Sequence, residues 1–522
     1  MKMDQGWKQT LFYAPQTGLM ADWSGMDLNK DFLDSMQPKI SAALAGMKEL
    51  EGGAIANPDE GRMVGHYWLR APQLAPTPEL KKEIEDCVDK VRRFAVDVHS
   101  GRVKTERGDV FRHVIVGGIG GSSLGPMFVA DALDSPSDPM DLYFMDNTDP
   151  AGMDKVFAAL KSDLDAALTI IISKSGGTIE TRNCMVEAKA FYEANGLDFA
   201  KHAVCVSGAG SKLDRTAESE GWLDRFPMWD WVGGRTSVMS AVGLLPLALK
   251  GVDIDRFLAG AADCDKLGRC ETAAENPALL LALSWYRCSG GLGGVTQVVL
   301  PYKDSLMLFA KYLQQLVMES LGKEFDLEGN TVHQGLAVMG NKGTSDQHSY
   351  VQQLVAGPDN IFVTFVQVLK DRASASMTVG EGSTSGDYLN AFMLGTKKAL
   401  EDHGKRTFLL TVPEADAYNV GQLIAIFERA VSMYAIMIGI NAYHQPAVEF
   451  GKKAAGGLID LKNRAEETLL ASSRAMTAQE LADVLDAQAD DVFRLMLHLC
   501  SNDPRFTVSV KDPVAESTFG KR

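Results

Sequence analysis

Short apolar runs alternate with longer amphipathic segments through most of this chain, and this alternation limits the possible folds more than any other feature. In the first half the runs are HVIVGG (113–118), LYFMDN (142–147), LTIIISKS (168–175) and HAVCVSG (202–208). The segments between them have the length and pattern of helices. Strands that are apolar along their whole length, each followed by a helix, form parallel sheets covered by helices on both faces. We therefore expect an α/β domain over residues 106–285.

The same rhythm recurs in the second half of the chain. Its apolar runs are TQVVLPY (296–302), LAVMG (336–340), NIFVTFVQV (360–368) and RTFLLTV (406–412). Each precedes a helical pattern, so we expect a second, similar α/β domain over residues 286–464. The predicted fold class is α/β, with two parallel-sheet αβα sandwich domains. Helical extensions are expected at residues 1–105, packing on the second α/β domain, and at residues 465–522.

Length and composition are those of an ordinary globular protein. At 522 residues the chain is too long for one core, and 46% hydrophobic with 23% charged residues is close to the globular average. The most apolar segments, TSVMSAVGLLPLAL and AVSMYAIMIGINAYHQPAV, contain Gly, Ser, Asn or Pro and are expected to be buried helices rather than membrane spans. The start, MKMDQGWKQTLFYAPQ, lacks the apolar region of a secretory signal, so we expect mature sequence.

Cysteine usage and charge exclude several classes of site. The seven cysteines show no C-x-x-C pair, which predicts reduced thiols in the cytoplasm and argues against a zinc site. A formal net charge of -16 disfavours a nucleic-acid surface, because phosphate backbones require concentrated Lys and Arg. If the ligand is an anion, its positive partner must be local.

The third strand runs into SKSGGTIET (173–181), where hydroxyls and bare backbone amides are concentrated. In open parallel sheets, ligands bind beyond the carboxyl ends of strands, where the next helix presents free N–H groups and the positive end of its dipole. The stretch offers hydroxyls, glycine amides and one cation, from Ser173, Ser175, Thr178, Gly176, Gly177 and Lys174. A phosphate-binding turn and a plain helix cap both remain consistent with this pattern, since caps use the same residue types.

A second glycine-rich turn follows the first strand, in GGIGGSSLGP (117–126). Its Gly118-x-Gly120-x-x-Ser123 pattern has serine where a dinucleotide-binding motif has its third glycine. Asp146, at the end of the next strand, is also farther from the glycines than the usual ribose-binding acid. Two Gly/Ser turns in one sheet suit a phosphorylated small molecule better than a dinucleotide.

Six segments together resemble the phosphoglucose isomerase family. They are GGIGGSSLGP, SKSGGTIET, WVGGRTSVMSAVGL, LQQLVMESLGK, GTSDQHSYVQQL and INAYHQPAVEFGKK, and they follow the family's order between residues 117 and 453. The resemblance implies two sugar-isomerase-type domains and a homodimer with sites shared between subunits. It also implies interconversion of glucose 6-phosphate and fructose 6-phosphate, with no metal, nucleotide or other cofactor.

Glu319 has the sequence context of a general base. Helical spacing places it on the same stripe as Leu308, Tyr312 and Gln315, so it emerges from a largely apolar face. Desolvation there would raise its pKa toward the range useful for a base. On spacing alone, an i,i+4 salt bridge with Lys323 is the alternative. The resemblance implies that Glu319 carries the proton between C1 and C2 and that Gln315 lies beside the substrate.

Arg235 and His348 are two further candidates. Arg235 follows two glycines near Trp229 and Trp231, and its permanent charge could stabilise an enediolate oxygen; an ion pair between domains or stacking on Trp is the alternative. His348 opens a helical segment, and a neutral imidazole can pass protons, although a lone histidine is more often structural. The resemblance implies that Arg235 and the Gly234 amide act on the enediolate side. It also implies that His348 helps ring opening from the neighbouring subunit.

The remaining site residues are assigned by resemblance alone. Lys452 matches the family lysine near the ring oxygen, with Lys453 as the adjacent alternative, and Gln445 matches a glutamine on the phosphate side. The phosphate and sugar cradle is expected to consist of Gly121, Ser122, Ser173, Lys174, Ser175 and Thr178, with Glu180 as a supporting acid.

The chain departs from the family pattern at three places. Gly176 and Gly177 stand where many members carry bulkier or hydroxylated residues, which bears on how phosphate contacts divide between side chains and backbone. Leu321 stands where asparagine is frequent and cannot make that side chain's hydrogen bond. Pro446 and Ala447 affect loop shape more than chemistry. None of these departures removes a proposed reacting group.

Two other functions compete with isomerisation. A non-catalytic sugar-phosphate sensor could use the same cradle, since fold does not fix function, but it has no need of Glu319, His348 and Lys452. A nucleotide-dependent oxidoreductase would require cofactor binding, and the imperfect glycine pattern argues against it.

Overall fold

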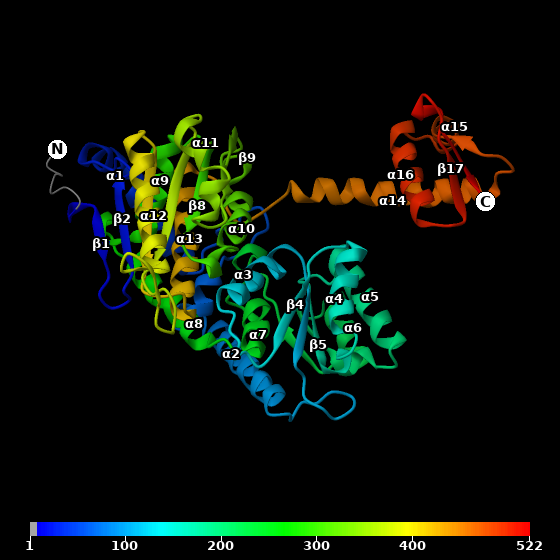
Figure 1. The fold of residues 1–522 in the computed structure, drawn as a ribbon, viewed down its shortest axis with the longest axis horizontal. Coiled ribbons are helices and arrows are strands. Elements are labelled where there is room, and N and C mark those ends of the chain that lie inside the picture. Colours follow the sequence, from blue (N-terminus) through cyan, green and yellow to red (C-terminus); the bar gives the residue numbers. More distant parts are fainter. Residues whose placement is uncertain (1–7) are drawn as a thin grey trace. The chain divides into compact units, whose positions relative to one another are not determined.

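The computed structural model describes residues 8–522 and divides the chain into two compact units. The first unit ends at His444, and the second is Gln445–Arg522. The first unit contains both large sheets and all the strands predicted from the apolar runs (Figure 1).

The first sheet has five parallel strands in the order β4-β3-β5-β6-β7. The strands are β3 (His113–Gly117), β4 (Asp141–Met145), β5 (Ala167–Ile172), β6 (Ala203–Ser207) and β7 (Asp224–Pro227). Every residue of β5 and β6 is buried, as expected for strands covered on both faces. The first four strands were predicted from their apolar runs. β7 was not, because its sequence DRFP contains charge and proline.

Helices cover both faces of the first sheet (Figure 1). They are α2 (Pro78–His99), α3 (Leu124–Ala132), α4 (Pro150–Leu160), α5 (Ile179–Ala194), α6 (Lys212–Glu220) and α7 (Ala241–Lys250). Successive strand residues face opposite cores. Ile115 and Ile171 pack with residues of α4, α5 and α6, whereas Val116 and Ile170 pack with the core that contains α2, α3 and α7.

The strand order creates a topological switch point between β3 and β5. From β3 the chain proceeds outward to β4 and then returns to place β5 on the other side of β3. The connections that follow β3 and β5 therefore diverge, which is where open α/β sheets bind ligands. The two Gly/Ser turns predicted to bind an anion are the connections that flank this point.

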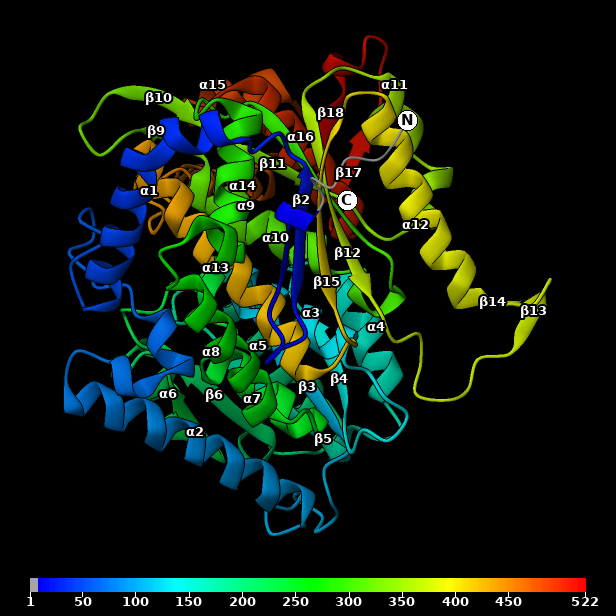
Figure 2. The same ribbon diagram turned by 90° about the vertical axis from the view of Figure 1, so that its left-hand side faces the viewer.

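The second sheet has six strands in the order β1-β2-β15-β12-β8-β11. They are β1 (Leu11–Tyr13), β2 (Met20–Gly25), β8 (Val295–Pro301), β11 (Leu336–Met339), β12 (Ile361–Val368) and β15 (Arg406–Val412). The four predicted strands are parallel, and β1 and β2 add an antiparallel edge next to β15 (Figure 2). The N-terminal segment was expected to be helical. It also supplies β1 and β2, which the sequence did not indicate because both are short and alternate in burial instead of forming a continuous apolar run.

The remaining helices of the first unit surround the second sheet and join it to the first. They are α1 (Lys30–Glu51), α8 (Ile254–Gly268), α9 (Pro277–Ser289), α11 (Val351–Ala356), α12 (Ser385–Asp402) and α13 (Ala417–Ile438). α13 is long and apolar enough to cross a membrane, but 89% of its apolar window is buried inside the protein. It is therefore a core helix, and α7 is buried along its whole length, as the sequence predicted for both.

The helix predicted over residues 304–321 is not uniform. It consists of a 3-10 turn at Asp304–Leu306, α10 (Phe309–Leu313) and a π-helical turn at Gln314–Glu319. π-helical turns interrupt the regular hydrogen-bond ladder and are frequent at functional sites. The two short strands β9 (Lys323–Phe325) and β10 (Thr331–Gln334) follow as a separate antiparallel pair.

The second unit is built on α14 (Val448–Ala471) and has its own core. Its other elements are β16 (Met476–Thr477), α15 (Ala478–Leu485), α16 (Ala489–Asn502), β17 (Phe506–Ser509) and β18 (Thr518–Lys521). The two helices predicted in the tail correspond to α15 and α16. Residue 464, the predicted end of the second α/β domain, lies inside α14, and the four-part division made from the sequence stays a prediction.

Candidate active site

The turn after β3 is locked to the loop that carries Arg235. A Cβ atom added at Gly121 would lie 2.0 Å from the carbonyl oxygen of Gly234, so the two backbones touch. The Ser237 hydroxyl donates to the Gly234 carbonyl at 2.7 Å and lies 3.3 Å from the Gly121 carbonyl, to which it also donates. Glycine is required at position 121 because any side chain would separate these two segments.

The turn after β5 is held by hydrogen bonds of its own. The Gly176 amide donates to Ser173 Oγ at 3.2 Å, and the Gly177 amide donates to Ser175 Oγ at 3.1 Å. Ser173 Oγ in turn donates to Thr178 Oγ1 at 3.4 Å. Thr178 precedes α5 in the N-cap position, but within residues 8–522 its side chain accepts no capping hydrogen bond. A plain Ser/Thr helix cap therefore does not account for this turn.

The two sides of the β5 turn face different cavities. Ser173, Gly176 and Thr178 line a pocket of 240 Å³ at the start of α5 and α6. Lys174 and Ser175 line a separate hollow of 750 Å³ next to α2. The hydroxyls of the predicted cradle thus divide between two sides of the turn.

Lys174 is held by the protein itself. Its ammonium group donates to the main-chain carbonyls of Asp230 and Val232, at 3.0 and 3.2 Å, and lies 3.4 Å from the Asp230 carboxylate. Burial lowers the pKa of Lys174, and the negative charge of Asp230 offsets part of this effect. Lys174 therefore ties the β5 turn to the tryptophan-rich segment before Arg235, a contact that the sequence did not indicate.

Glu319 and Arg235 face each other. Arg235 Nε lies 3.6 Å from Glu319 Oε2, and the carboxylate side chain is 25% exposed while the arginine is 5% exposed. Burial lowers the pKa of Arg235, and the Glu319 charge acts in the opposite direction. The alternative i,i+4 salt bridge is not formed, because Lys323 Nζ donates to the main-chain carbonyl of Glu319 rather than to its carboxylate. The arrangement places a half-exposed carboxylate beside a buried cation.

Gln315 lies between the helix that carries Glu319 and the turn after β3. It is half-buried one turn before Glu319, and its Nε2 lies 3.2 Å from where a Cβ atom on Gly120 would be. A side chain at position 120 would crowd Gln315, and the φ of +59° at Gly120 also favours glycine. The helix that carries Glu319 and the turn after β3 are therefore in contact at Gly120.

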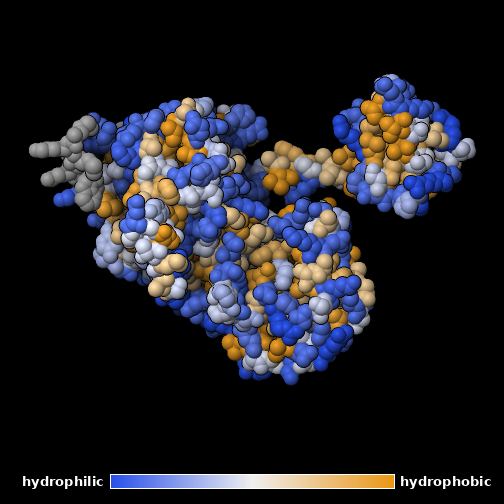
Figure 3. All heavy atoms as spheres, in the orientation of Figure 1, coloured by the Kyte–Doolittle hydropathy of each residue, from blue (hydrophilic) through white to orange (hydrophobic). Residues whose placement is uncertain are grey.

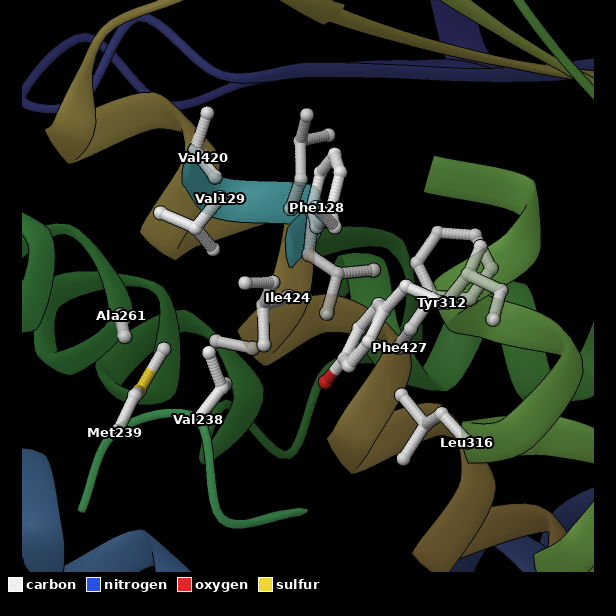
Figure 4. Close-up of a cluster of buried hydrophobic side chains, with 14 of the residues drawn as sticks. Phe128, Val129, Val238, Met239, Ala261, Tyr312, Leu316, Val420, Ile424 and Phe427 are labelled. Atoms are coloured by element: carbon white, nitrogen blue, oxygen red, sulfur yellow. The ribbon is translucent and has the colours of Figure 1, made fainter. Parts of the chain in front are cut away.

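A single hydrophobic core supports these site segments from behind (Figure 4). Tyr312 and Leu316 come from the helix that carries Glu319, and Val238 and Met239 from the loop that carries Arg235. Phe128 comes from α3, which follows the β3 turn, and stacks on Tyr312 with ring centroids 5.7 Å apart. The core fixes the separation of the three segments.

The other predicted residues are not part of this cluster of contacts. His348 is exposed at the end of a 3-10 turn, Ser345–His348, and Glu180 lies half-buried in the first turn of α5. Gln445 and Lys452 belong to the second unit, where Lys452 Nζ pairs with Glu449 Oε1 at 2.8 Å. Among residues 8–522 no group of three or more His, Cys, Asp or Glu side chains is placed to bind a metal ion.

Sequence reasoning missed several residues that hold the site. Ser237 joins two of its backbones, and Lys323 and the carbonyl of His444 lie next to Arg235 and Glu319. The only signal was the spacing of Lys323 four residues after Glu319, which suggested a different contact.

Comparisons with known proteins agree on one family. A family model described as phosphoglucose isomerase matches residues 22–477. The chain is 53% identical to a glucose-6-phosphate isomerase of Desulfitobacterium hafniense strain Y51 over 517 residues, covering 98% of this chain and 97% of the relative. It is also 53% identical to a glucose-6-phosphate isomerase of Geobacter sulfurreducens over 522 residues, covering 99% of each.

A solved structure shows the same fold. The crystal structure of a glucose-6-phosphate isomerase from Chlamydia trachomatis superposes with a TM-score of 0.80 at 26% sequence identity, covering 88% of this chain and 91% of that chain.

Proposed function

Because this chain belongs to the phosphoglucose isomerase family, we propose how its residues interconvert glucose 6-phosphate and fructose 6-phosphate. The reaction moves a hydrogen between C1 and C2 of an opened sugar through an enediol(ate) intermediate. One observation carries the assignment of residues: the carboxylate of Glu319, 25% exposed, stands 3.6 Å from a buried arginine.

The phosphate is bound at the switch point of the first sheet. Ser122 and the Gly121 amide follow β3, and Ser173, Ser175 and Thr178 follow β5. The first turn of α5 supplies free N–H groups and a positive dipole end, which favour an anion. Lys174 supports this turn through the carbonyls of Asp230 and Val232, and its charge adds to the local positive potential. Binding the phosphate away from the reacting carbons orients them for proton transfer.

Glu319 moves the proton, and Arg235 stabilises the intermediate. The carboxylate removes the proton from one carbon and returns it to the next. Its partly exposed position gives it access to substrate. The Arg235 guanidinium and the Gly234 amide then face the oxygen that becomes negative. Gln315, one turn before Glu319, contacts the sugar from the same helix.

Ring opening is assigned to His348 and Lys452. Both matches come from family segments, with Gln445 on the phosphate side and Glu180 as a supporting acid. His348 is exposed, which suits a residue that enters the site of a neighbouring subunit. Lys452, rather than the adjacent Lys453, is the lysine near the ring oxygen.

A coupled assay that converts fructose 6-phosphate into glucose 6-phosphate, with a chelator present, tests this function. Glu319→Gln keeps the size of the side chain but removes the base, so we expect kcat to fall by about 10²–10⁴-fold. Binding of the sugar phosphate, measured by calorimetry, should persist. Near wild-type turnover of this variant would remove Glu319 from the mechanism, and an inactive wild type would reject the function itself.

A non-catalytic sensor has no support. Relatives that share about half of their residues with this chain, over nearly their whole length, are named for the catalytic activity.

We propose in addition that the protein is a cytoplasmic homodimer whose sites are shared between subunits. The hairpin of β13 (Thr378–Gly380) and β14 (Ser383–Thr384) and the following α12 expose large apolar side chains, as Figure 2 helps to locate. These include Met377, Val379, Phe392 and Leu394. On the face drawn in Figure 3 hydrophobic residues also gather at several places among hydrophilic ones. Apolar surface of this kind marks protein interfaces.

Mixed dimers test the sharing of sites. Subunits carrying Glu319→Gln and subunits carrying His348→Asn are each expected to form inactive homodimers. If each site takes Glu319 from one subunit and His348 from the other, refolding the two together restores one intact site in each mixed dimer, or about a quarter of the wild-type activity. A mixture that stays inactive while mixed dimers form would show that both residues act within one subunit.

A further inference from the structure

Lys323 lies at the start of β9, directly after the helix that carries Glu319, and it is buried. Its Nζ donates to two main-chain carbonyls, that of Glu319 at 2.7 Å and that of His444 at 3.0 Å. None of the roles proposed above uses this amino group. It nevertheless touches the backbone of the residue that moves the proton.

The carbonyl oxygen of His444 accepts hydrogen bonds from two basic side chains, Lys323 and Arg235. Arg235 Nη2 donates to the same oxygen at 3.4 Å. A continuous chain of contacts therefore runs from Arg235 through the His444 carbonyl to Lys323 and on to the backbone of Glu319. A second connection closes the ring, since Arg235 Nε lies 3.6 Å from the Glu319 carboxylate.

We propose that Lys323 is a positioning residue for the isomerisation: by joining the Glu319 and His444 carbonyls, it sets the separation between the base and the arginine that stabilises the enediolate. This proposal rests on the function proposed above. It assigns Lys323 no contact with substrate, so its effect reaches the reaction only through Glu319 and Arg235. Without the amino group, the end of the π-helical turn and the His444 segment lose their common partner.

The segment that Lys323 holds is itself anchored on its far side. Asn57 Nδ2 donates to the Tyr443 carbonyl at 3.4 Å, and Asn441 Nδ2 donates to Asn57 Oδ1 at 3.0 Å. His444 Nδ1 lies 3.6 Å from an oxygen of Asp59. Residues 441–444 are bonded to the 57–59 segment, so the hydrogen bonds of Lys323 connect the backbone of Glu319 to an anchored segment.

The charges around Lys323 suit a residue that holds two backbone segments by hydrogen bonds rather than one that neutralises a carboxylate. Burial lowers its pKa to about 7, with Arg235 acting in the same direction and Glu319 and Asp59 against it. Two further groups face Lys323 and Arg235. The charge of Glu60 acts to raise the pKa of Arg235, and burial together with the charges of Lys323 and Arg235 lowers the pKa of His444. An amine that has lost its proton still carries two N–H donors, one for each carbonyl. The two bonds therefore persist on both sides of neutral pH.

Lys323→Met tests the proposal, because methionine keeps the length and apolar stem but removes all donors. We expect kcat to fall by about 10- to 100-fold, as for a small misplacement of reacting groups, while KM for fructose 6-phosphate changes by less than about threefold. Lys311→Met, at an exposed position of α10, is the matched control and should leave kcat and KM unchanged.

If the methionine variant does not fold, Lys323→Gln decides. Its amide satisfies part of the buried carbonyl demand, but it is shorter and uncharged and cannot reach both carbonyls at once. We expect a folded protein with kcat at least about fivefold lower and KM within about threefold. A kcat within about twofold of wild type in the folded variant, or a loss confined to KM, would overturn the proposal.

The outcome separates this proposal from the function on which it rests. Wild-type activity that depends on Glu319 but not on Lys323 would reject the positioning role and leave the isomerase intact. Absence of activity in the wild type would reject the function before Lys323 is considered. A double variant with Arg235→Lys should lose less than the product of the two single effects, since both residues act on one geometry.

Discussion

Two arginine–carboxylate groups in the first unit differ in how completely their charges are satisfied. Around Asp265, Arg70 forms two bonds of 2.8 and 2.9 Å and Arg429 a third of 2.6 Å, and all three side chains are fully buried. Glu428 and Glu51 complete that cluster by pairing with Arg70 and Arg429. At the candidate site, Arg235 and Glu319 are 3.6 Å apart and the carboxylate is partly exposed.

The difference separates a structural ion cluster from the pair that we propose to be catalytic. The Asp265 cluster uses its charges on itself, and the two arginines lower the pKa of Asp265 to about 2 although burial acts in the opposite direction. A carboxylate held in that way is a poor base. The Glu319 carboxylate lies 3.6 Å from Arg235 and is 25% exposed, so it keeps the capacity to interact with a substrate. The comparison predicts stability effects in one place and rate effects in the other.

The largest effect is expected from Asp265→Ala. Removing this carboxylate leaves Arg70 and Arg429 buried with less compensation, which should lower the free energy of unfolding by about 3–5 kcal/mol. Urea unfolding followed by circular dichroism measures it. Asp255→Ala, which breaks an exposed pair with Arg92, should change the same quantity by less than about 0.5 kcal/mol. Equal effects of the two variants would show that the buried cluster is not structural.

Arg235→Met should separate rate from stability. Losing the cation that we propose faces the enediolate is expected to lower kcat by about 10²–10³-fold, while the free energy of unfolding falls much less than in the Asp265 variant. Steady-state kinetics and urea unfolding on the same preparation measure both. Arg256→Met, which breaks a surface pair with Asp416, is the control. A stability loss without a rate loss would place Arg235 with the structural cluster.

The pH dependence of stability should carry the mark of Asp265. Its folded-state pKa lies near 2, below the ordinary value of 3.8, so the folded state binds fewer protons than the unfolded state between those values. The stabilisation is therefore complete above about pH 4 and falls by about 2 kcal/mol as the pH drops through the folded-state value. The difference in unfolding free energy between wild type and Asp265→Asn should shrink by that amount between pH 5 and pH 2. A constant difference would contradict the assignment.

The smallest effect is expected from Ser237→Ala. The hydroxyl bonds two carbonyls, those of Gly121 and Gly234, and its loss should cost about 1 kcal/mol of unfolding free energy. Because those carbonyls join the β3 turn to the arginine loop, KM for the sugar phosphate should also rise. Ser219→Ala, which removes an exposed bond to the Thr216 carbonyl, is the control and should leave KM unchanged. An unchanged KM in the Ser237 variant would mean that this link does not shape the site.

The sequence was most informative where a segment is buried on both faces. β5 and β6 are apolar at nearly every position, and their neighbours in the sheet follow from the same pattern. β1 and β2 were not predicted because a short strand of alternating burial resembles a loop, and β7 was not predicted because half of its residues are polar.

At the site, the sequence indicated chemistry but not direction. Both Gly/Ser turns were found from composition, and they do flank the switch point. The side chain of Lys174, however, points to carbonyls of Asp230 and Val232 because those carbonyls need donors, a demand no local pattern reveals. Lys323 likewise reaches the backbone of Glu319 rather than its carboxylate, because that carboxylate faces Arg235. Helical spacing predicts contacts within one helix and gives no information on a partner that comes from another element.

The shared core behind the three site segments has a consequence for how this enzyme can change. Phe128, Tyr312, Leu316 and Val238 are buried in this core, yet their volumes set how far apart the proposed reacting groups lie. A methyl group gained or lost there is transmitted as a displacement of the catalytic machinery. Differences in turnover among close relatives would then arise from core side chains that do not contact the substrate.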